Sequence, residues 1–128
     1  MTKVQEIMQR EVFRLFPETP LAPAAHALEQ QFMGGAPVCD ADGHVLGVLS
    51  RSDLIEVDER RRSHGTVGDL MVHDVVSAAP SAPAIDVVRQ MLAHGVHRVV
   101  VLDGEGKLVG LVTTMDVLRA IANGASFT

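Results

Sequence analysis

The stretch GVHRVVVLDGEGKLVGLVTTMD, residues 95–116, decides the fold of this chain. Two mainly aliphatic segments, Arg98–Leu102 and Leu108–Val112, flank the segment Asp103-Gly-Glu-Gly106. Such runs favour buried strands, and the Asp/Gly chemistry between them favours a tight turn. The stretch ends with Thr113 and, three positions later, Asp116, which is typical of a helix start. We therefore expect a β-hairpin that leads directly into a helix.

The same pattern occurs once more, 63 residues earlier, so that Gly47 corresponds to Gly110 and Asp53 to Asp116 without a gap. The other matches in this register are Val4–Met8 with Val67–Met71, Pro17 with Pro80, Pro20 with Pro83, Pro37–Asp40 with Val100–Asp103, and Gly43 with Gly106. A series of turn and cap residues in one register indicates an internal duplication.

Each copy predicts the order strand, helix, strand, strand, helix. In the second copy Ile85, Val88, Met91 and Leu92 recur at three- and four-residue spacing, as a helix with one buried face requires. The predicted elements are extended stretches at Val12–Phe16 and Val75–Ala79, helices at Leu21–Met33 and Ala84–His94, first-copy strands at Ala36–Cys39 and Val45–Leu49, and last helices starting at Ser52–Asp53 and Met115–Asp116. We interpret Val57–Thr66 as a linker.

The duplication predicts an α+β fold built from two tandem βαββα repeats, residues 1–60 and 61–128. A domain of about 60 residues is marginal alone, because it buries too little apolar surface. Two copies packed sheet to sheet with pseudo-twofold symmetry would share one core. We expect one compact two-repeat module, with a ligand-binding groove between the repeats.

Composition and charge limit the classes of partner. The chain has 128 residues, 47% hydrophobic and 21% charged, in the range of ordinary globular domains. It has no Trp or Tyr, so we expect an aliphatic core. A formal net charge of −5 argues against nucleic-acid binding, which needs a basic face. The basic cluster Arg60–Arg62 follows several acids and is interpreted as a solvated linker or helix end.

The remaining bulk features favour a soluble protein of the cytoplasm. A single cysteine, Cys39, cannot form an internal disulfide, and we expect it to be a small buried hydrophobe. The charged N-terminal segment does not resemble a signal peptide, and no apolar run approaches membrane-spanning length. We predict no membrane association and no metal site, since the histidines lack supporting carboxylate or cysteine spacing.

The duplicated pattern resembles the tandem CBS-domain pair, the regulatory Bateman module named after cystathionine β-synthase. The residues that carry the resemblance are Val67–Met71, Gly95–Asp103, Lys107–Asp116 and their first-copy counterparts, and it extends from about Val4 to Asn123. The resemblance implies a stand-alone regulatory sensor of an adenine nucleotide (AMP, ADP or ATP) or a related adenosyl ligand. It also implies a homodimer formed through helices and no catalysis, and the sequence contains no nucleophile or acid–base constellation. Any signal would pass through an unidentified client protein, or ligand buffering would itself be the role.

The first candidate site residues are Ser50-Arg-Ser-Asp53 and Thr113-Thr-Met-Asp116. One interpretation is structural, because a hydroxyl followed three positions later by an acid caps a helix. The other is ligand binding: the helix start presents free N–H groups to phosphate, and an exposed carboxylate could accept hydrogen bonds from both ribose hydroxyls. In the resembling family this element contacts ribose and phosphate. Arg51 could add charge near a phosphate or could simply be solvated.

The second candidate group lies before the strand Val99–Leu102. His97 and Arg98 could clamp a phosphate, since Arg offers a bidentate fork, or could form a polar strand entry with Arg98 paired to a surface acid. Their counterparts are Gly34 and Gly35, so the two sites should differ. We expect His97 and Arg98 to complete a site with Asp53 from the other repeat. Ser77 could line an adenine pocket.

An alternative from another class is a structural dimerisation or interaction module with no bound ligand. Leu15 and Phe16 are bulky where the second copy has Ala78 and Ala79, and this difference favours a filled groove at one site. The apolar faces of the last helices could form the dimer contact or could lie inside the monomer. These faces comprise Leu54, Ile55, Val117, Leu118 and Ile121.

Overall fold

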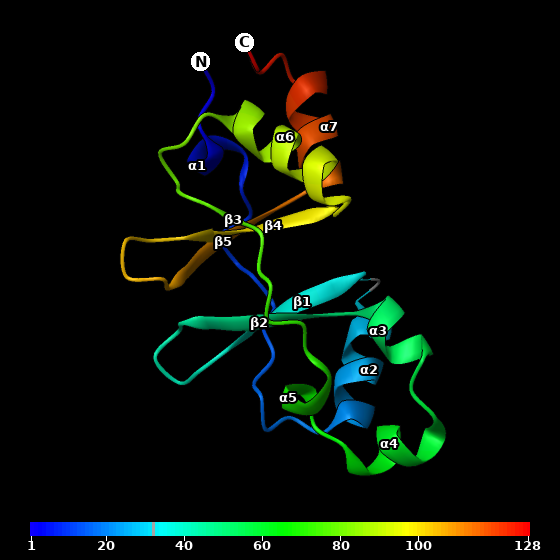
Figure 1. The fold of residues 1–128 in the computed structure, drawn as a ribbon. Helices are drawn as coiled ribbons and strands as arrows, with labels where there is room; N and C mark the ends of the chain where they lie inside the picture. Colours follow the sequence, from blue (N-terminus) through cyan, green and yellow to red (C-terminus); the bar gives the residue numbers. More distant parts are fainter. Residues whose placement is uncertain (32) are drawn as a thin grey trace. The chain divides into compact units, whose positions relative to one another are not determined.

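The computed structural model describes residues 1–31 and 33–128, and the chain divides into two compact units (Figure 1). Unit 1 comprises Met1–Val12 and Val76–Thr128, and unit 2 comprises Phe13–Val75. Both units combine helices with a small β-sheet, so the predicted α+β class is confirmed.

Unit 2 is built around the antiparallel pair β1 (Gly35–Cys39) and β2 (Val45–Ser50). Its helices are α2 (Leu21–Gln30), α3 (Arg51–Ile55), α4 (Glu59–His64) and α5 (Val67–Leu70). The isolated parallel bridge Leu15–Val38 adds the expected extended stretch beside β1. The core of the unit is aliphatic, as expected, and its fully buried side chains include Leu21, Leu28 and Leu49.

Unit 1 contains a three-stranded sheet in the order β3-β4-β5, with β3 (Ser77–Ala78) parallel to β4 (Arg98–Leu102) and β4 antiparallel to β5 (Leu108–Thr113). Its helices are α1 (Val4–Ile7), α6 (Ala84–His94) and α7 (Thr114–Ala122), and they cover one face of the sheet (Figure 1). Val4, Val87 and Val101 are fully buried between these layers.

The duplication extends to the pattern of strand pairing. Gly35 pairs with Ser50 in one hairpin and Arg98 with Thr113 in the other, and both hairpins carry an irregularity one residue before β1 or β4 ends. The isolated bridges correspond as well: Val48–Val72 in unit 2 matches Gln9–Leu111 in unit 1. Equivalent residues of the two repeats therefore occupy equivalent backbone positions within their units.

Each unit includes the opening segment of the other sequence repeat. In unit 1 the segment after α1 pairs with β5: Gln9 and Leu111 exchange backbone hydrogen bonds of 2.8 and 3.0 Å. In unit 2 Val72, after α5, and Val48, in β2, exchange the equivalent bonds at 2.9 Å each. Glycine allows this approach in unit 2, since a Cβ at Gly47 would lie 2.7 Å from the carbonyl oxygen of Val72. The first residues of the chain therefore stabilise the sheet of the second repeat.

Three sequence expectations about element bounds need correction. The predicted linker Val57–Thr66 contains helix α4, because Asp58 caps it by accepting a 2.8 Å hydrogen bond from the backbone N–H of Arg61. The predicted helix Leu21–Met33 ends at Gln30, and Phe32 lies outside the described residues. The last helices begin one residue earlier than predicted, at Arg51 and Thr114.

Within the described residues, no helix has the length and apolar character needed to cross a bilayer.

Candidate ligand site

The two strand-to-helix junctions have the same capping geometry. Ser50 caps α3, and the Asp53 Oδ2 atom accepts hydrogen bonds from the Ser50 backbone N–H (2.9 Å) and Oγ (2.7 Å). Thr113 caps α7, and the Asp116 Oδ2 atom accepts from the Thr113 backbone N–H (2.8 Å) and Oγ1 (3.0 Å). The capping interpretation is therefore confirmed at both junctions, and each acid has one oxygen committed to the fold.

The second oxygen of Asp116 is also occupied. Gln9 Nε2 donates to both carboxylate oxygens, at 3.1 and 2.9 Å, and Arg119 Nη1 lies 3.1 Å from Oδ1. Asp116 is only 4% exposed as a result. The expectation of an exposed carboxylate is wrong for Asp116, because the pairing of Gln9 with Leu111 brings the glutamine side chain onto it.

Asp53 differs from Asp116 at this second oxygen. The counterpart of Gln9 is Val72 and the counterpart of Arg119 is Glu56, and neither side chain can donate a hydrogen bond to a carboxylate. Asp53 is half-buried, and its Oδ1 accepts no hydrogen bond from any residue in the described part of the chain. Asp53 thus keeps an acceptor available at the start of α3.

Arg98 is a half-buried cation at the first position of β4, opposite Thr113 in the hairpin register. Across residues 1–31 and 33–128 it forms no ion pair, so the alternative of a surface-acid partner is not realised. Burial lowers the pKa of Arg98 from its very high ordinary value, and the guanidinium stays charged at neutral pH. This positive charge is available to an anion.

His97 precedes β4 and is exposed, and its carbonyl oxygen accepts hydrogen bonds from the Thr114 backbone N–H (3.0 Å) and Oγ1 (3.2 Å). Ser77 lies in β3 opposite Val100, and its carbonyl accepts a 3.1 Å bond from Gln90 Nε2. In unit 1 the strand pairing thus brings Arg98 beside Thr113 and His97 beside Thr114, while Ser77 lies on the other side of β4.

The predicted residues of unit 2 form a separate group. Ser50 and Asp53 are hydrogen-bonded to each other, and Arg51 is exposed as the first residue of α3. The backbone N–H of Arg51 donates to the carbonyl of Gly34 at 2.8 Å. The eight predicted site residues therefore divide into three in unit 2 and five in unit 1.

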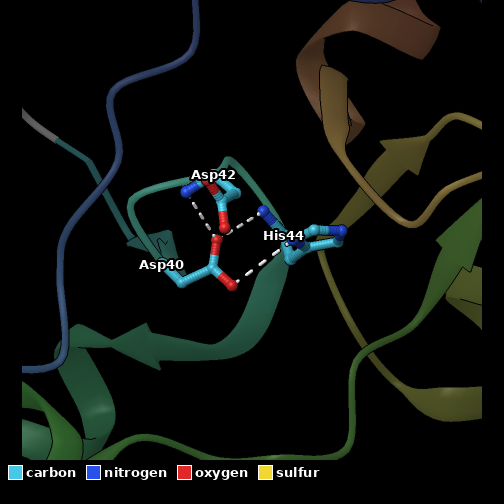
Figure 2. A group of neighbouring side chains, drawn as sticks. All are labelled: Asp40, Asp42 and His44. Atoms are coloured by element: carbon cyan, nitrogen blue, oxygen red, sulfur yellow. Dashed lines mark hydrogen bonds and ion pairs between the residues drawn. The ribbon is translucent and has the colours of Figure 1, made fainter.

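A turn in unit 2 gathers Asp40, Asp42 and His44, whose potential ligand atoms lie within 4.8 Å of one another (Figure 2). Asp40 Oδ1 accepts the backbone N–H groups of Asp42 (3.0 Å) and His44 (2.9 Å), and Oδ2 lies 3.4 Å from His44 Nδ1. Asp103 makes the same backbone pair with Glu105 and Lys107. Turn formation accounts for the placement of Asp40, since its counterpart does the same without a histidine.

A shallow depression of about 470 Å³ lies over α4 and α5, and none of the predicted site residues lines it. Its lining mixes both signs of charge, and consists of Asp58, Arg60, Arg61, His64, Gly65 and Asp69. The Asp58 side chain already caps α4, and Asp69 accepts a 2.9 Å bond from the Thr66 backbone N–H. Both carboxylates of the depression are thus committed to capping the helices α4 and α5.

Sequence reasoning missed Gln9 and Arg119, the two side chains that cover Asp116. The aligned repeats contained a signal for them, because Gln9 aligns with Val72 and Arg119 aligns with Glu56. Each mismatch changes a hydrogen-bond donor into a group that cannot donate. The mismatches became meaningful only when strand pairing placed Gln9 at Asp116.

Comparison with known proteins supplies the family context. The model of the CBS domain matches residues 4–60 and 67–123. Inosine-5'-monophosphate dehydrogenase from Methanocaldococcus jannaschii is 26% identical over 117 residues, which are 91% of this chain but only 23% of that enzyme. An uncharacterized 17.7 kDa protein of Acidianus ambivalens is 27% identical over 120 residues, covering 94% of this chain and 73% of that protein.

Solved structures share the fold. CBSX2 of Arabidopsis thaliana, crystallised in complex with AMP, superposes with a TM-score of 0.88 at 27% identity and covers 96% of this chain and 98% of that chain. The CBS domain pair of protein MJ0100 superposes with a TM-score of 0.85 at 22% identity, with the same coverage, and supports the fold.

Proposed function

Because this chain belongs to the CBS domain family and carries the domain twice, we propose that it is a regulatory module that binds an adenosyl ligand, with AMP or ATP as the first candidates. The observation that carries the proposal is the half-buried Asp53 carboxylate, which keeps one oxygen available at the start of α3. The AMP complex of CBSX2, a relative at 27% identity, supports the choice of ligand class.

In this proposal Asp53 recognises the ribose. A carboxylate offers about four lone-pair sites, and a ribose cis-diol can donate two hydrogen bonds. Oδ2 of Asp53 accepts from Ser50, whereas Oδ1 is available for the diol. The Ser50 cap fixes the carboxylate at the helix start, so little side-chain entropy is lost on binding.

Arg98 and His97 recognise the phosphate in the same proposal. The half-buried Arg98 guanidinium has no acidic partner in the described part of the chain, and it can bind a phosphate in a bidentate manner. His97 is exposed beside it and adds a donor. The remaining predicted residues complete the proposal, with Arg51 near the phosphate and Ser77 near the adenine.

The ligand acts by a shift in conformational equilibrium and not by catalysis. A ligand shifts such an equilibrium only through its different affinities for the two states. The signal would pass to a client protein, and the lone buried Cys39 is compatible with the reducing setting of the cytoplasm. The dehydrogenase similarity covers only 23% of that enzyme and does not transfer its reaction.

Isothermal titration with AMP and ATP tests the proposal. Wild type should bind, Asp53→Asn should bind at least about tenfold more weakly, and Arg98→Met should lose affinity for AMP more than for adenosine. Thermal shifts should grow with ligand concentration. Asp116→Asn is the matched control, and loss of binding only in that variant would contradict the role of Asp53.

We also propose a homodimer formed through the exposed face of α7. Met115, Leu118 and Ile121 are 61%, 53% and 55% exposed and recur at three-residue spacing, whereas Val117 is buried in unit 1. An apolar helical stripe of this kind is suited to a second copy of itself, because a twofold contact is self-complementary.

Sedimentation equilibrium tests the dimer. Wild type should be dimeric at micromolar concentration, and Leu118→Glu should be monomeric because it introduces a charge at the apolar contact. Arg89→Glu on α6, outside the stripe, is the control for charge alone. The alternative of a purely structural module without ligand was based on the bulky Leu15 and Phe16. Leu15 packs into the core of its own unit and no longer supports it, whereas Phe16 is 39% exposed. A dimer that binds none of the nucleotides would favour that alternative.

A further inference from the structure

We propose that Gln9 and Arg119 occupy the ribose position of Asp116 and thereby restrict the chain to one adenosyl ligand, bound at Asp53. This inference rests on the proposed function and adds to it the number of ligands and the residues that set this number. Neither side chain belongs to the repeated capping motif, and both lie in unit 1 with Asp116.

The acceptor capacity of Asp116 is filled. Its two oxygens receive the Thr113 backbone N–H, the Thr113 hydroxyl, the Gln9 amide and the Arg119 guanidinium, all between 2.8 and 3.1 Å. Four donors match the approximately four lone-pair sites of a carboxylate. A ribose diol can reach this carboxylate only by displacing the Gln9 amide, the Arg119 guanidinium or both.

The backbone holds Gln9 in this position. Gln9 and Leu111 exchange two backbone hydrogen bonds, so the residue is part of the sheet edge and not of a loose terminus. Gly110 leaves room for the segment, since a Cβ there would lie 2.5 Å from Met8 Sδ and 3.0 Å from the Gln9 carbonyl oxygen. The amide is therefore pre-positioned, and it competes with a ligand at little entropic cost.

Arg119 adds a charged partner from one turn further along α7. Its side chain is 63% exposed while that of Asp116 is 3% exposed, so the guanidinium covers the carboxylate from the solvent side. Displacing a hydrogen bond to an ionised group weakens a competing ligand by about tenfold or more.

Unit 2 provides the natural comparison. Val72 occupies the backbone position of Gln9 and exchanges the same two hydrogen bonds with Val48, but its side chain cannot donate. Glu56 is the counterpart of Arg119 in the first repeat, and a carboxylate cannot donate a hydrogen bond either. The backbone geometry is the same at both acids, and two side chains make the difference.

Grafting these two side chains between the units tests the inference. Adenosine is the probe, because it carries the ribose diol and does not depend on a phosphate clamp, which the Gly34–Gly35 counterpart of His97–Arg98 cannot provide. Wild type should bind one adenosine per chain, and Gln9→Val with Arg119→Glu should bind two. The reciprocal graft, Val72→Gln with Glu56→Arg, should abolish binding at Asp53 and leave unit 1 unchanged.

The outcomes separate this inference from the proposed function. Wild type that binds two adenosines, or a Gln9→Val/Arg119→Glu variant that still binds one, would overturn the inference and leave the proposed function standing. Wild type that binds neither adenosine nor AMP would overturn both. If Gln9→Val/Arg119→Glu does not fold, the reciprocal graft decides, and full binding by that folded variant would overturn the inference.

Discussion

Two aspartates at the same place in a duplicated motif have different environments. Asp116 is buried and accepts from Thr113, Gln9 and Arg119, whereas Asp53 is half-buried and, among the described residues, accepts side-chain hydrogen bonds from Ser50 alone. Buried polar groups contribute to stability when every partner is present and are costly when one is lost. We therefore expect Asp116 to serve mainly the stability of the fold and Asp53 mainly the ligand.

Asp116→Asn should lower the free energy of unfolding by about 1–3 kcal/mol, because the new amide presents N–H groups to donors that then lose their acceptor. Asp53→Asn should cost less, since asparagine can keep both hydrogen bonds that Oδ2 accepts from Ser50 through its single oxygen. Urea denaturation followed by circular dichroism measures both. Equal losses in the two variants would contradict the difference in environment.

At the scale of the elements, turns and close approaches define the hairpins. Asp40 and Asp103 each accept two backbone N–H groups in the turns between paired strands. Gly47 lies in β2, where the segment around Val72 crosses at close range. These local interactions set where the hairpins turn and which segment can pair at their edge.

Gly47→Ala should destabilise the protein by about 1–3 kcal/mol, because the added Cβ would lie 2.7 Å from the backbone oxygen of Val72, which cannot move aside as a flexible side chain could. Gly104→Ala is the matched control, since a Cβ there meets nothing within 4 Å. Thermal denaturation of both variants measures the difference. A Gly47→Ala variant as stable as Gly104→Ala would show that the approach is looser than described.

The lowered pKa of Asp40 predicts that part of the free energy of unfolding depends on pH in the acidic range. Desolvation opposes the shift, but hydrogen bonds from the backbone N–H groups of His44 and Asp42 prevail and lower the pKa of Asp40. A lowered folded-state pKa stabilises the fold above the ordinary aspartate value, and this contribution is lost as the pH falls through the folded-state value.

Asp40→Asn keeps an acceptor for the turn but cannot titrate, so its stability should fall less steeply over that acidic range than the stability of wild type. Chemical denaturation at a series of pH values measures the slopes. Asp42→Asn removes a neighbouring carboxylate that accepts no described hydrogen bond, and serves as the control for charge alone. A slope in Asp40→Asn identical to that of wild type would contradict the assignment.

For the whole molecule, the opening segments are exchanged between the repeats. Val4 of α1 is fully buried in the core of unit 1 with Val87 and Val99, and Val67 of α5 is fully buried in the core of unit 2. Residues 1–12 and 67–75 thus stabilise sheets that belong to the other repeat in sequence. Neither repeat completes its core from its own contiguous residues.

Val4→Ala should cost about 2 kcal/mol through lost burial and an incompletely filled cavity. Hydrogen exchange should then accelerate in β4 and β5, because local stability follows the packing of each unit. Val67→Ala, its counterpart, should accelerate exchange in β1 and β2. Mass spectrometry of peptides from the two hairpins distinguishes these patterns. Faster hydrogen exchange in β1 and β2 of Val4→Ala would contradict the assignment of residues 1–12 to unit 1.

The duplication, both hairpin turns, both helix caps and the aliphatic core could be predicted from the amino-acid sequence alone. Each depends on a few neighbouring residues, such as Thr113 with Asp116, or on a period in the chain. Helix α4 was missed because its Asp58 cap lies within a highly charged stretch that is also typical of a solvated linker.

The difference between the two aspartates was decided by tertiary structure. Gln9 and Asp116 are 107 residues apart, and only the pairing of Gln9 with Leu111 brings the amide to the carboxylate. No local pattern encodes such a contact, because it depends on which of two similar sheets the opening segment joins. The two capping aspartates were therefore predictable from the sequence, whereas the contacts that Gln9 and Arg119 make with Asp116 were not.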